Sequence, residues 1–225
     1  MADRVASAVP RVDRMGDAAL LVTLGEDLDL GANAWAHRIA EGLLLHRRTQ
    51  GGLGVAVPGH ASVLVPFDPE ACPEDEVRRL LAEVMAETAA SAARPDGPLH
   101  HIGVSYGGVD GPDLPEVAAR TGLSEGEVVR RHAGVEYRVL VLGFVPGFPY
   151  LAEVPKILDL PRRPTPRVNV PAGSVAIAGR QTGIYPFATP GGWHLLGRTD
   201  APLWDPRRDP PTLLAPGDRV RFIPG

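Results

Sequence analysis

The chain has 225 residues, 44% of them hydrophobic, and a formal net charge of −4 at pH 7, so it can bury the core of one large or two small domains. This charge, without a Lys/Arg-rich tract, gives no reason to expect a nucleic-acid partner. The single cysteine, Cys72, excludes an intrachain disulfide and a cysteine-cluster metal site. No apolar run reaches the roughly 20 residues that cross a bilayer, and the N-terminus lacks a signal-peptide pattern. We therefore expect a cytoplasmic protein without membrane contact.

The first part of the chain predicts an antiparallel sheet covered by two helices. Two short β-patterned runs lie within residues 10–24, and apolar residues recur at helical spacing in Leu30–Arg48. Leu53–Val57 and Ala61–Phe67 predict a hairpin, and Pro73–Ala93 predicts a second amphipathic helix with acidic residues in its first turn. This order of elements predicts an α+β sandwich with both helices on one face of the sheet.

A domain boundary is predicted at Arg94–Pro98, because Pro, Asp-Gly and Pro follow a helix there. Gly and Pro are much more frequent after this point, which is typical of a β-rich, turn-rich structure. We therefore divide the chain into a small α/β sandwich domain, residues 1–94, and a mostly β domain, residues 95–225.

The second domain predicts short strands with two short helices. Leu99–Tyr106 and Tyr137–Leu142 are apolar strands. Asp113–Arg120 and Ser124–His132 are predicted helices, and the latter begins with an S-x-x-E capping box. A turn precedes a closing strand at Arg219–Ile223. So many short strands indicate a closed or half-closed barrel.

The stretch Arg162–Arg198, RRPTPRVNVPAGSVAIAGRQTGIYPFATPGGWHLLGR, is the candidate binding surface. Its Pro and Gly density is too high for a helix, and short β-branched runs between these residues predict strands joined by tight turns. Hydrogen-bonding side chains gather at the turns, as in binding surfaces built on rigid scaffolds. The aromatic segment just upstream, Leu142–Leu151 (LGFVPGFPYL), is assigned to the same site.

Each polar candidate has a functional and a structural interpretation. Arg167 and Arg198 could each clamp a carboxylate or phosphate, or could satisfy loop carbonyls. Gln181 and Thr182 are predicted just past a strand, where they could bind a small polar ligand or fix a turn. His132 closes the second short helix and could transfer a proton, or stabilise the helix C-terminus as a cation.

The remaining candidates are aromatic. Phe144 and Trp193 could line a pocket or fill the core, and Tyr185 is one of the hydrogen-bonding groups of the central stretch. The chain has no GxSxG, Walker A or HExxH signature, and no GxGxxG after a strand. His100 and His101 are adjacent on a predicted strand and face opposite sides, so no metal site is predicted.

These two segments, together with YGGVDGPDLPEVAARTGLSEGEVVRRH and LLAPGDRVRF, closely resemble the family of 5-oxoprolinase B subunits. That family includes the sporulation-kinase inhibitor KipI and was long labelled allophanate hydrolase subunit 1. The resemblance runs from about Gly16 to Phe222. It implies a small N-terminal α/β domain followed by a cyclophilin-like β-barrel domain.

The resemblance also implies partners and an activity. Family members work with a cyclophilin-like C subunit and with an A subunit that uses ATP, so this chain would bind no cofactor itself. Together the three proteins would open 5-oxoproline to glutamate, and the isolated chain is expected to be inactive. Two alternatives stay open, namely a KipI-like inhibitor of a sensor histidine kinase, which needs no catalysis, and a subunit of a urea or allophanate pathway.

Within the matching motifs, catalysis is assigned to His132, Gln181 and Thr182. His132 would shuttle a proton, and Gln181 and Thr182 would donate to the substrate carbonyl. Substrate binding is assigned to a second group, with either arginine on the carboxylate or phosphate: Arg167, Arg198, Phe144, Tyr185 and Trp193.

Overall fold

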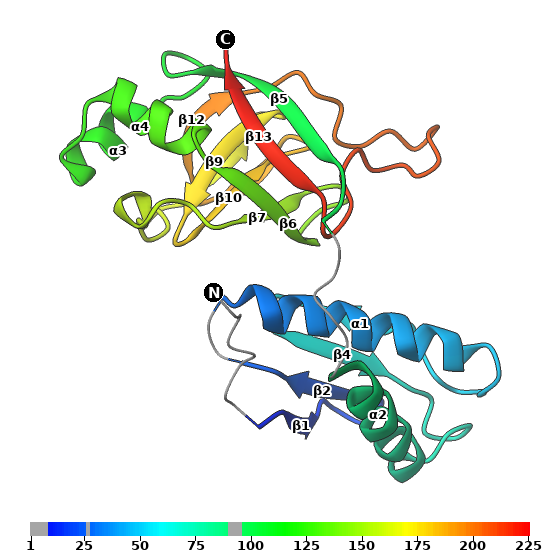
Figure 1. The fold of residues 1–225 in the computed structure, drawn as a ribbon. Helices are drawn as coiled ribbons and strands as arrows, with labels where there is room; N and C mark the ends of the chain where they lie inside the picture. The colour runs from blue at the N-terminus through cyan, green and yellow to red at the C-terminus, as the bar shows by residue number, and fades with distance from the viewer. Residues whose placement is uncertain (1–8, 26–27, 90–95) are drawn as a thin grey trace. The chain divides into compact units, whose positions relative to one another are not determined.

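The computed structural model describes residues 9–25, 28–89 and 96–225 (Figure 1). The chain divides into two compact units, Met1–Pro95 and Asp96–Gly225. Each unit has a hydrophobic core of its own. The predicted boundary, Arg94–Pro98, lies partly outside the described residues.

The N-terminal unit is an antiparallel sheet with two helices. Its described elements are β1 (Arg11–Arg14), β2 (Ala19–Thr23), α1 (Leu30–Arg47), β3 (Val57–Pro58), β4 (Ser62–Pro66) and α2 (Glu74–Ala89). The strand order is β1-β2-β4-β3. The predicted hairpin is present, but its first strand is reduced to Val57–Pro58, and Leu53 joins only through an isolated bridge to Phe67. Gly54 still donates its N–H to the Pro66 carbonyl at 2.8 Å. Pro66 has no N–H to donate in return, so the ladder is interrupted opposite it.

One face of this sheet carries the core of the unit. Leu20 and Val22 of β2 lie opposite Val65 and Val63 of β4, and all four side chains are completely buried. They pack in one cluster with the apolar sides of α1 and α2. The period-two alternation of the strands therefore selects the face that the helices cover.

The C-terminal unit is a closed barrel with two helices outside it. Its elements are β5 (Leu99–Tyr106), α3 (Leu114–Thr121), α4 (Glu125–Ala133), β6 (Glu136–Leu142), β7 (Pro149–Ala152), the 3₁₀ helix η1 (Lys156–Leu158), β8 (Arg167–Val170), β9 (Ser174–Ala178), β10 (Gln181–Ile184), β11 (Thr189–Gly191), β12 (His194–Arg198) and β13 (Arg219–Pro224). Within residues 96–225, seven strands close in the order β10-β7-β6-β13-β5-β12-β9, and β8 pairs with β11 in a separate ribbon. The predicted α+β fold with a barrel is confirmed.

The last strand completes this barrel. In Figure 1, β13 runs between β5 and β6, and α3 and α4 lie side by side outside the barrel. Strand β13 is parallel to β5 and antiparallel to β6. Its alternate residues Val220 and Phe222 are buried in the same cluster as Ile102 and Val104 of β5. The barrel core thus depends on side chains from both ends of the unit.

The starts of α3 and α4 differ in how their backbone is capped. Ser124 accepts from the Glu127 N–H, and the Glu127 carboxylate accepts from the Ser124 N–H, so the predicted capping box is confirmed. Asp113 is the N-cap of α3, but its side chain makes no capping hydrogen bond. Its carboxylate binds residues far along the chain instead.

Candidate functional site

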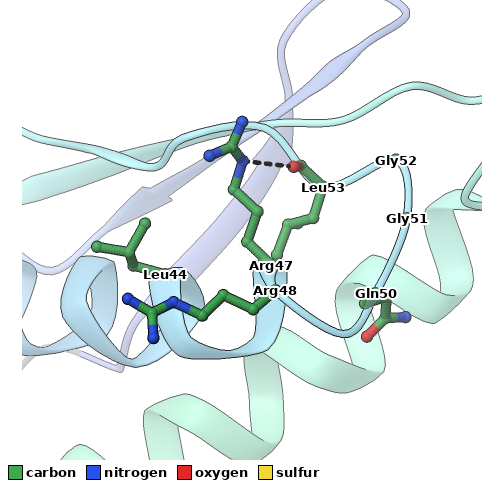
Figure 2. Close-up of a pocket in the computed structure, with 7 residues that line it drawn as sticks. All are labelled: Leu44, Arg47, Arg48, Gln50, Gly51, Gly52 and Leu53. Carbon is green, nitrogen blue, oxygen red and sulfur yellow. Dashed lines mark hydrogen bonds between the residues drawn. The ribbon is translucent and has the colours of Figure 1, made fainter.

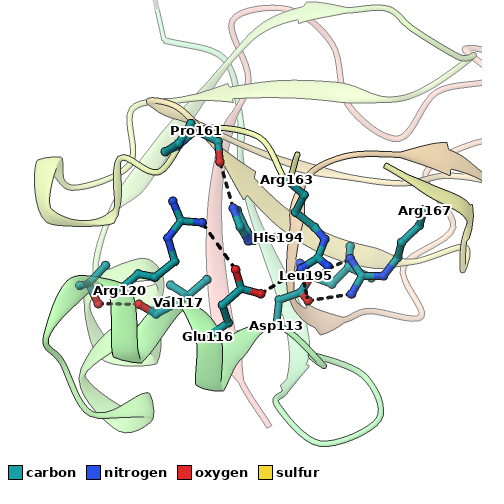
Figure 3. Close-up of polar contacts among 10 residues, drawn as sticks. Asp113, Glu116, Val117, Arg120, Pro161, Arg163, Arg167, His194 and Leu195 are labelled. Atoms are coloured by element: carbon teal, nitrogen blue, oxygen red, sulfur yellow. Dashed lines mark hydrogen bonds and ion pairs between the residues drawn. The ribbon is translucent and has the colours of Figure 1, made fainter. Parts of the chain in front are cut away.

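A buried carboxylate links α3 to the central stretch (Figure 3). Asp113 is 3% exposed, and its two oxygens accept from both Nη atoms of Arg167, at 2.9 and 2.7 Å. One Nη atom of Arg163 donates to the same carboxylate at 2.9 Å and to Glu116 at 3.0 Å. The backbone N–H of Leu195 donates to Asp113 at 2.7 Å. Asp113 therefore joins α3, β8 and β12.

The charge of Asp113 is maintained by these donors. Burial raises the pKa of this carboxyl, but hydrogen bonds from Arg167 and the Leu195 N–H, with the charges of Arg167 and Arg163, hold the pKa below its ordinary value. Arg167 thus has the predicted bidentate geometry, and the carboxylate that it binds is Asp113 of its own chain. A ligand carboxylate would have to compete with this buried ion pair.

Arg198, the other predicted clamp, is exposed at the end of β12. Its Nε donates to the carbonyl of Ala172 at 3.0 Å. This contact matches the structural interpretation that the sequence left open, an arginine that satisfies a loop carbonyl.

His132 lies inside the barrel, in a chain of directed hydrogen bonds. Its Nδ1 is 2.7 Å from the Tyr106 hydroxyl, its Nε2 is 2.9 Å from the Thr182 hydroxyl, and its ring stacks on Phe222. Thr182 donates its own proton to the Ala176 carbonyl at 3.0 Å. The Thr182 oxygen must then accept from His132 Nε2–H, and Nδ1 accepts from Tyr106. This bonding assigns the neutral, Nε2-protonated ring.

Burial lowers the pKa of His132 to about 3, so the ring is uncharged at neutral pH. The interpretation of His132 as a cation at the end of α4 is therefore wrong. Gln181 and Thr182 come just past β9, as predicted, and they begin the next strand, β10. His132 and Thr182 are 0% exposed, so a ligand on the surface of the barrel does not touch either side chain.

The three aromatic candidates come together around Phe148. Its ring is edge-to-face with those of Tyr185, Trp193, Tyr150 and Phe144, with centroids 4.9 to 5.6 Å apart. We call these five residues the aromatic cluster. Phe148, Tyr185 and Trp193 are buried, whereas Tyr150 is half-buried and Phe144 is 58% exposed. Contact with a ligand would thus be made chiefly by Phe144 and Tyr150.

Phe144 lies in a strained turn at the tip of the β6–β7 hairpin. Its φ is 64°, and Val145 N–H donates to the Gly143 carbonyl at 2.7 Å, which forms the rare γ-turn with positive φ at its centre. A residue other than glycine in this region costs about 1–3 kcal/mol. The loop 142–147 and Thr212 line a groove of about 330 Å³. The turn places the aromatic ring of Phe144 at this groove.

A larger open cavity, of about 490 Å³, lies in the N-terminal unit after α1 (Figure 2). It is lined by Leu44, Arg47, Arg48 and residues 50–53, and Arg47 Nε donates to the Leu53 carbonyl at 3.2 Å. Basic residues at a helix C-terminus stabilise the helix dipole, which gives both arginines a structural role. None of the predicted site residues lines this cavity.

Neither a metal-ligand cluster nor a membrane span is found in the part of the chain that the structure describes. Among residues 9–25, 28–89 and 96–225, no group of three or more His, Cys, Asp or Glu side chains could hold a metal ion. Over those same residues, every helix is too short or too polar to cross a membrane. Cys72 is buried, and burial raises the pKa of its thiol, as does the charge of Glu76.

Comparison with known proteins places this chain in a family. A family model for the carboxyltransferase domain, subdomain C and D, matches residues 10–214. The chain is 44% identical over 211 residues to a protein of Escherichia coli O157:H7 that is named as the B subunit of 5-oxoprolinase, covering 93% of this chain and 94% of that one. A Bacillus subtilis (strain 168) protein of the same name is 39% identical over 223 residues, covering 95% and 92%. The chain belongs to the family of 5-oxoprolinase B subunits.

A solved structure shares the fold of this chain. The crystal structure of TTHA0988 matches with a TM-score of 0.79 and 44% identity. The match covers 92% of this chain and 39% of the TTHA0988 chain. The fold of both units is therefore shared with a longer polypeptide.

In this member of the 5-oxoprolinase B-subunit family, Asp113 and Tyr106 are the main residues that the sequence analysis missed. The sequence pattern assigns Asp113 only to the first position of a helix. The signal that could have revealed its role is the pair Arg163 and Arg167, because two arginines in a turn-rich segment need an anion nearby. Tyr106 carries no local signal, since its contact with His132 depends on barrel closure.

Proposed function

We propose that this chain is the non-ATP-binding B subunit of a 5-oxoprolinase, an ATP-dependent cyclic-amide hydrolase that opens 5-oxoproline to glutamate. The observation that carries the proposal is the similarity to both named relatives over more than nine-tenths of each chain. A similarity of this extent includes both compact units, not one domain alone. We place the reaction in the cytoplasm.

The proposed partners are an A subunit that uses ATP and a C subunit that shares the substrate site. The length of TTHA0988 supports a partner beside this chain, because the matched region is 39% of that polypeptide and the rest is joined to it covalently. In the proposed complex this chain binds no cofactor of its own.

The chemistry explains the division of labour. A lactam carbonyl is a poor electrophile, so phosphorylation of its oxygen by ATP prepares the carbon for attack by water. The tetrahedral adduct then expels the ring nitrogen, which takes up a proton to become the free amine and leaves an acyl phosphate. A second water hydrolyses this acyl phosphate to glutamate and phosphate. Negative charge develops on oxygen along this path and needs fixed donors in a site shielded from water. The proposed work of this chain is to hold the ring and its carboxylate.

The test is reconstitution with purified proteins. We expect glutamate release from 5-oxoproline and ATP when all three subunits are present, and its loss when this chain is omitted. Full activity without this chain would contradict the proposal. Absence of glutamate release, with binding to a histidine-kinase dimerisation domain, would favour the inhibitor alternative, and turnover of allophanate or urea would favour the third.

A further inference from the structure

The central stretch 162–198 carries five arginines, and four of them are held by groups of this chain. Their partners are carboxylates or a backbone carbonyl, and the four are Arg163, Arg167, Arg180 and Arg198. Arg162 differs from them. Within the part of the chain that the structure describes, its side chain makes no hydrogen bond and no ion pair, and the residue is exposed. Arg162 can therefore bind an external anion without breaking an existing contact.

The backbone places Arg162 beside the aromatic cluster. The Pro161 carbonyl accepts from His194 Nε2 at 3.0 Å, and Arg163 N–H donates to the Gly192 carbonyl at 2.8 Å. Arg162 thus lies in a segment that runs along residues 192–194. The middle residue of that segment, Trp193, sends its indole ring into the aromatic cluster, 5.9 Å from the ring of Tyr150.

The charge of Arg162 acts on the pKa of two tyrosines of the aromatic cluster. Burial raises the pKa of Tyr150, and the positive charge of Arg162 opposes this rise. Burial also raises the pKa of Tyr185, to about 12, while a backbone hydrogen bond from Trp193 and the charges of Arg162 and Arg167 lower it. Arg198 does not contribute at either tyrosine. The charge of Arg162 thus acts on the cluster, in agreement with the position of its backbone beside Trp193.

We propose that Arg162 binds the carboxylate of a small cyclic carboxylate, whose ring packs against the accessible edge of the aromatic cluster at Phe144 and Tyr150. The proposal rests on the proposed function, because 5-oxoproline combines a lactam ring with one carboxylate. A guanidinium matches a carboxylate through parallel N–H donors. Arg167 could take this role only by leaving Asp113 buried without its bidentate partner.

The exposed aromatic edge gives the ring of such a ligand a surface. The γ-turn at Phe144 keeps its side chain 58% exposed, in a backbone region that most residues avoid. Strain of this kind persists where the surrounding structure enforces it, and it is frequent in binding sites. Arg162 and Phe144 then recognise different parts of one molecule, its charge and its apolar face.

The experiment is glutamate release by the reconstituted three-subunit complex, with this chain as wild type, Arg162→Ala or Arg162→Lys. Loss of a charge-assisted pair should raise the KM for 5-oxoproline about 10- to 100-fold in Arg162→Ala, with a smaller rise in Arg162→Lys. Arg131→Ala, which replaces an exposed arginine on α4, is the matched control and should leave the KM unchanged. Circular dichroism and a thermal melt verify that each variant folds.

A second substrate separates carboxylate binding from a structural effect. The wild-type complex should prefer 5-oxoproline to its neutral carboxamide, and Arg162→Ala should remove most of that preference. If the wild-type complex releases no glutamate, the proposed function fails and this inference fails with it. If the wild type is active but Arg162→Ala retains its KM and its preference, only the role of Arg162 is overturned. A rise in KM in Arg198→Ala alone would move the carboxylate site to the end of β12.

Discussion

Arg167 binds Asp113 through both of its Nη atoms, and this ion pair joins the start of α3 to the start of β8 across 54 positions of sequence. The pair is not isolated, because Arg163 and the Leu195 N–H also donate to the same carboxylate. A buried carboxylate with this many donors fixes the geometry of the surrounding loops. The stability of the C-terminal unit should depend on it.

Replacing Asp113 by Ala should lower the free energy of unfolding of the C-terminal unit by about 3–5 kcal/mol, because Arg167 and the buried Leu195 N–H lose this acceptor and Arg163 keeps only Glu116. Arg167→Ala should cost less, since Asp113 keeps Arg163 and Leu195. Urea unfolding of both variants and of the double mutant measures the coupling, which we expect at about 1–3 kcal/mol.

Glu116→Ala is the matched control for this cycle, because its carboxylate pairs with Arg163 but is 46% exposed. Glu116→Ala should lower the free energy of unfolding by less than about 1 kcal/mol. Additive effects of Asp113→Ala and Arg167→Ala would show that the ion pair contributes nothing beyond its separate residues.

Protonation of His132 should destabilise the C-terminal unit in acid. The pKa of His132 in the folded protein is about 3, against an ordinary value of 6.5, so the unfolded chain binds a proton that the folded chain excludes. This loss of stability is absent above pH 6.5. It grows as the pH falls toward 3, and the free energy of unfolding decreases by at most about 1.4 kcal/mol per pH unit. Hydrogen exchange of α4 and β10 between pH 5 and 8 measures the slope.

His132→Gln provides the comparison, because the amide does not titrate. Its unfolding free energy should be lower at neutral pH and should vary less with pH between 5 and 6.5 than that of the wild type. Parallel pH profiles for the two proteins would show that the imidazole takes up its proton in the folded state.

Gly173 should tolerate no side chain. Its φ is 80°, and a Cβ there would collide with the carbonyl oxygen of Thr199, whose N–H is itself bonded to the Gly173 carbonyl. Gly108 has a φ of 54° and open space within 4 Å of the position that a Cβ would take, so it isolates the backbone effect. We expect Gly108→Ala to cost about 1 kcal/mol and Gly173→Ala at least about 3 kcal/mol. Equal melting temperatures for the two variants would contradict this.

Much of the fold follows from local patterns. Helical spacing from Leu30 to Arg48 predicts α1 to within one residue, and the capping box at Ser124 predicts the start of α4. These signals are carried by residues near one another in sequence, and the structure keeps them. Barrel closure is expected from the number of short strands.

The candidate site was less predictable, because its contacts join distant segments. The sequence could not show that Arg167 is bound by Asp113. It also could not show that the Thr182 hydroxyl donates to the Ala176 carbonyl and accepts from His132. Residue type marks these side chains as polar and capable of binding, but partner and burial depend on which strands become neighbours. The same limit hid Arg162, which differs from four nearby arginines only in lacking a partner within the described residues.

Phe144 offers a test in which stability and function should separate. Phe144→Gly removes the strain of a positive φ, since glycine adopts this conformation freely, and it removes a ring that is already 58% exposed. We expect its unfolding free energy to stay within about 1 kcal/mol of wild type, because strain relief offsets the lost ring contacts. Phe144→Leu keeps the strain and should be the less stable of the two.

In the reconstituted complex both variants should raise the KM for 5-oxoproline by about 5-fold or more, because either one removes the aromatic face. A Phe144→Gly variant with unchanged KM would mean that the ring serves another surface, and a strongly destabilised one would mean that Phe144 is part of the core.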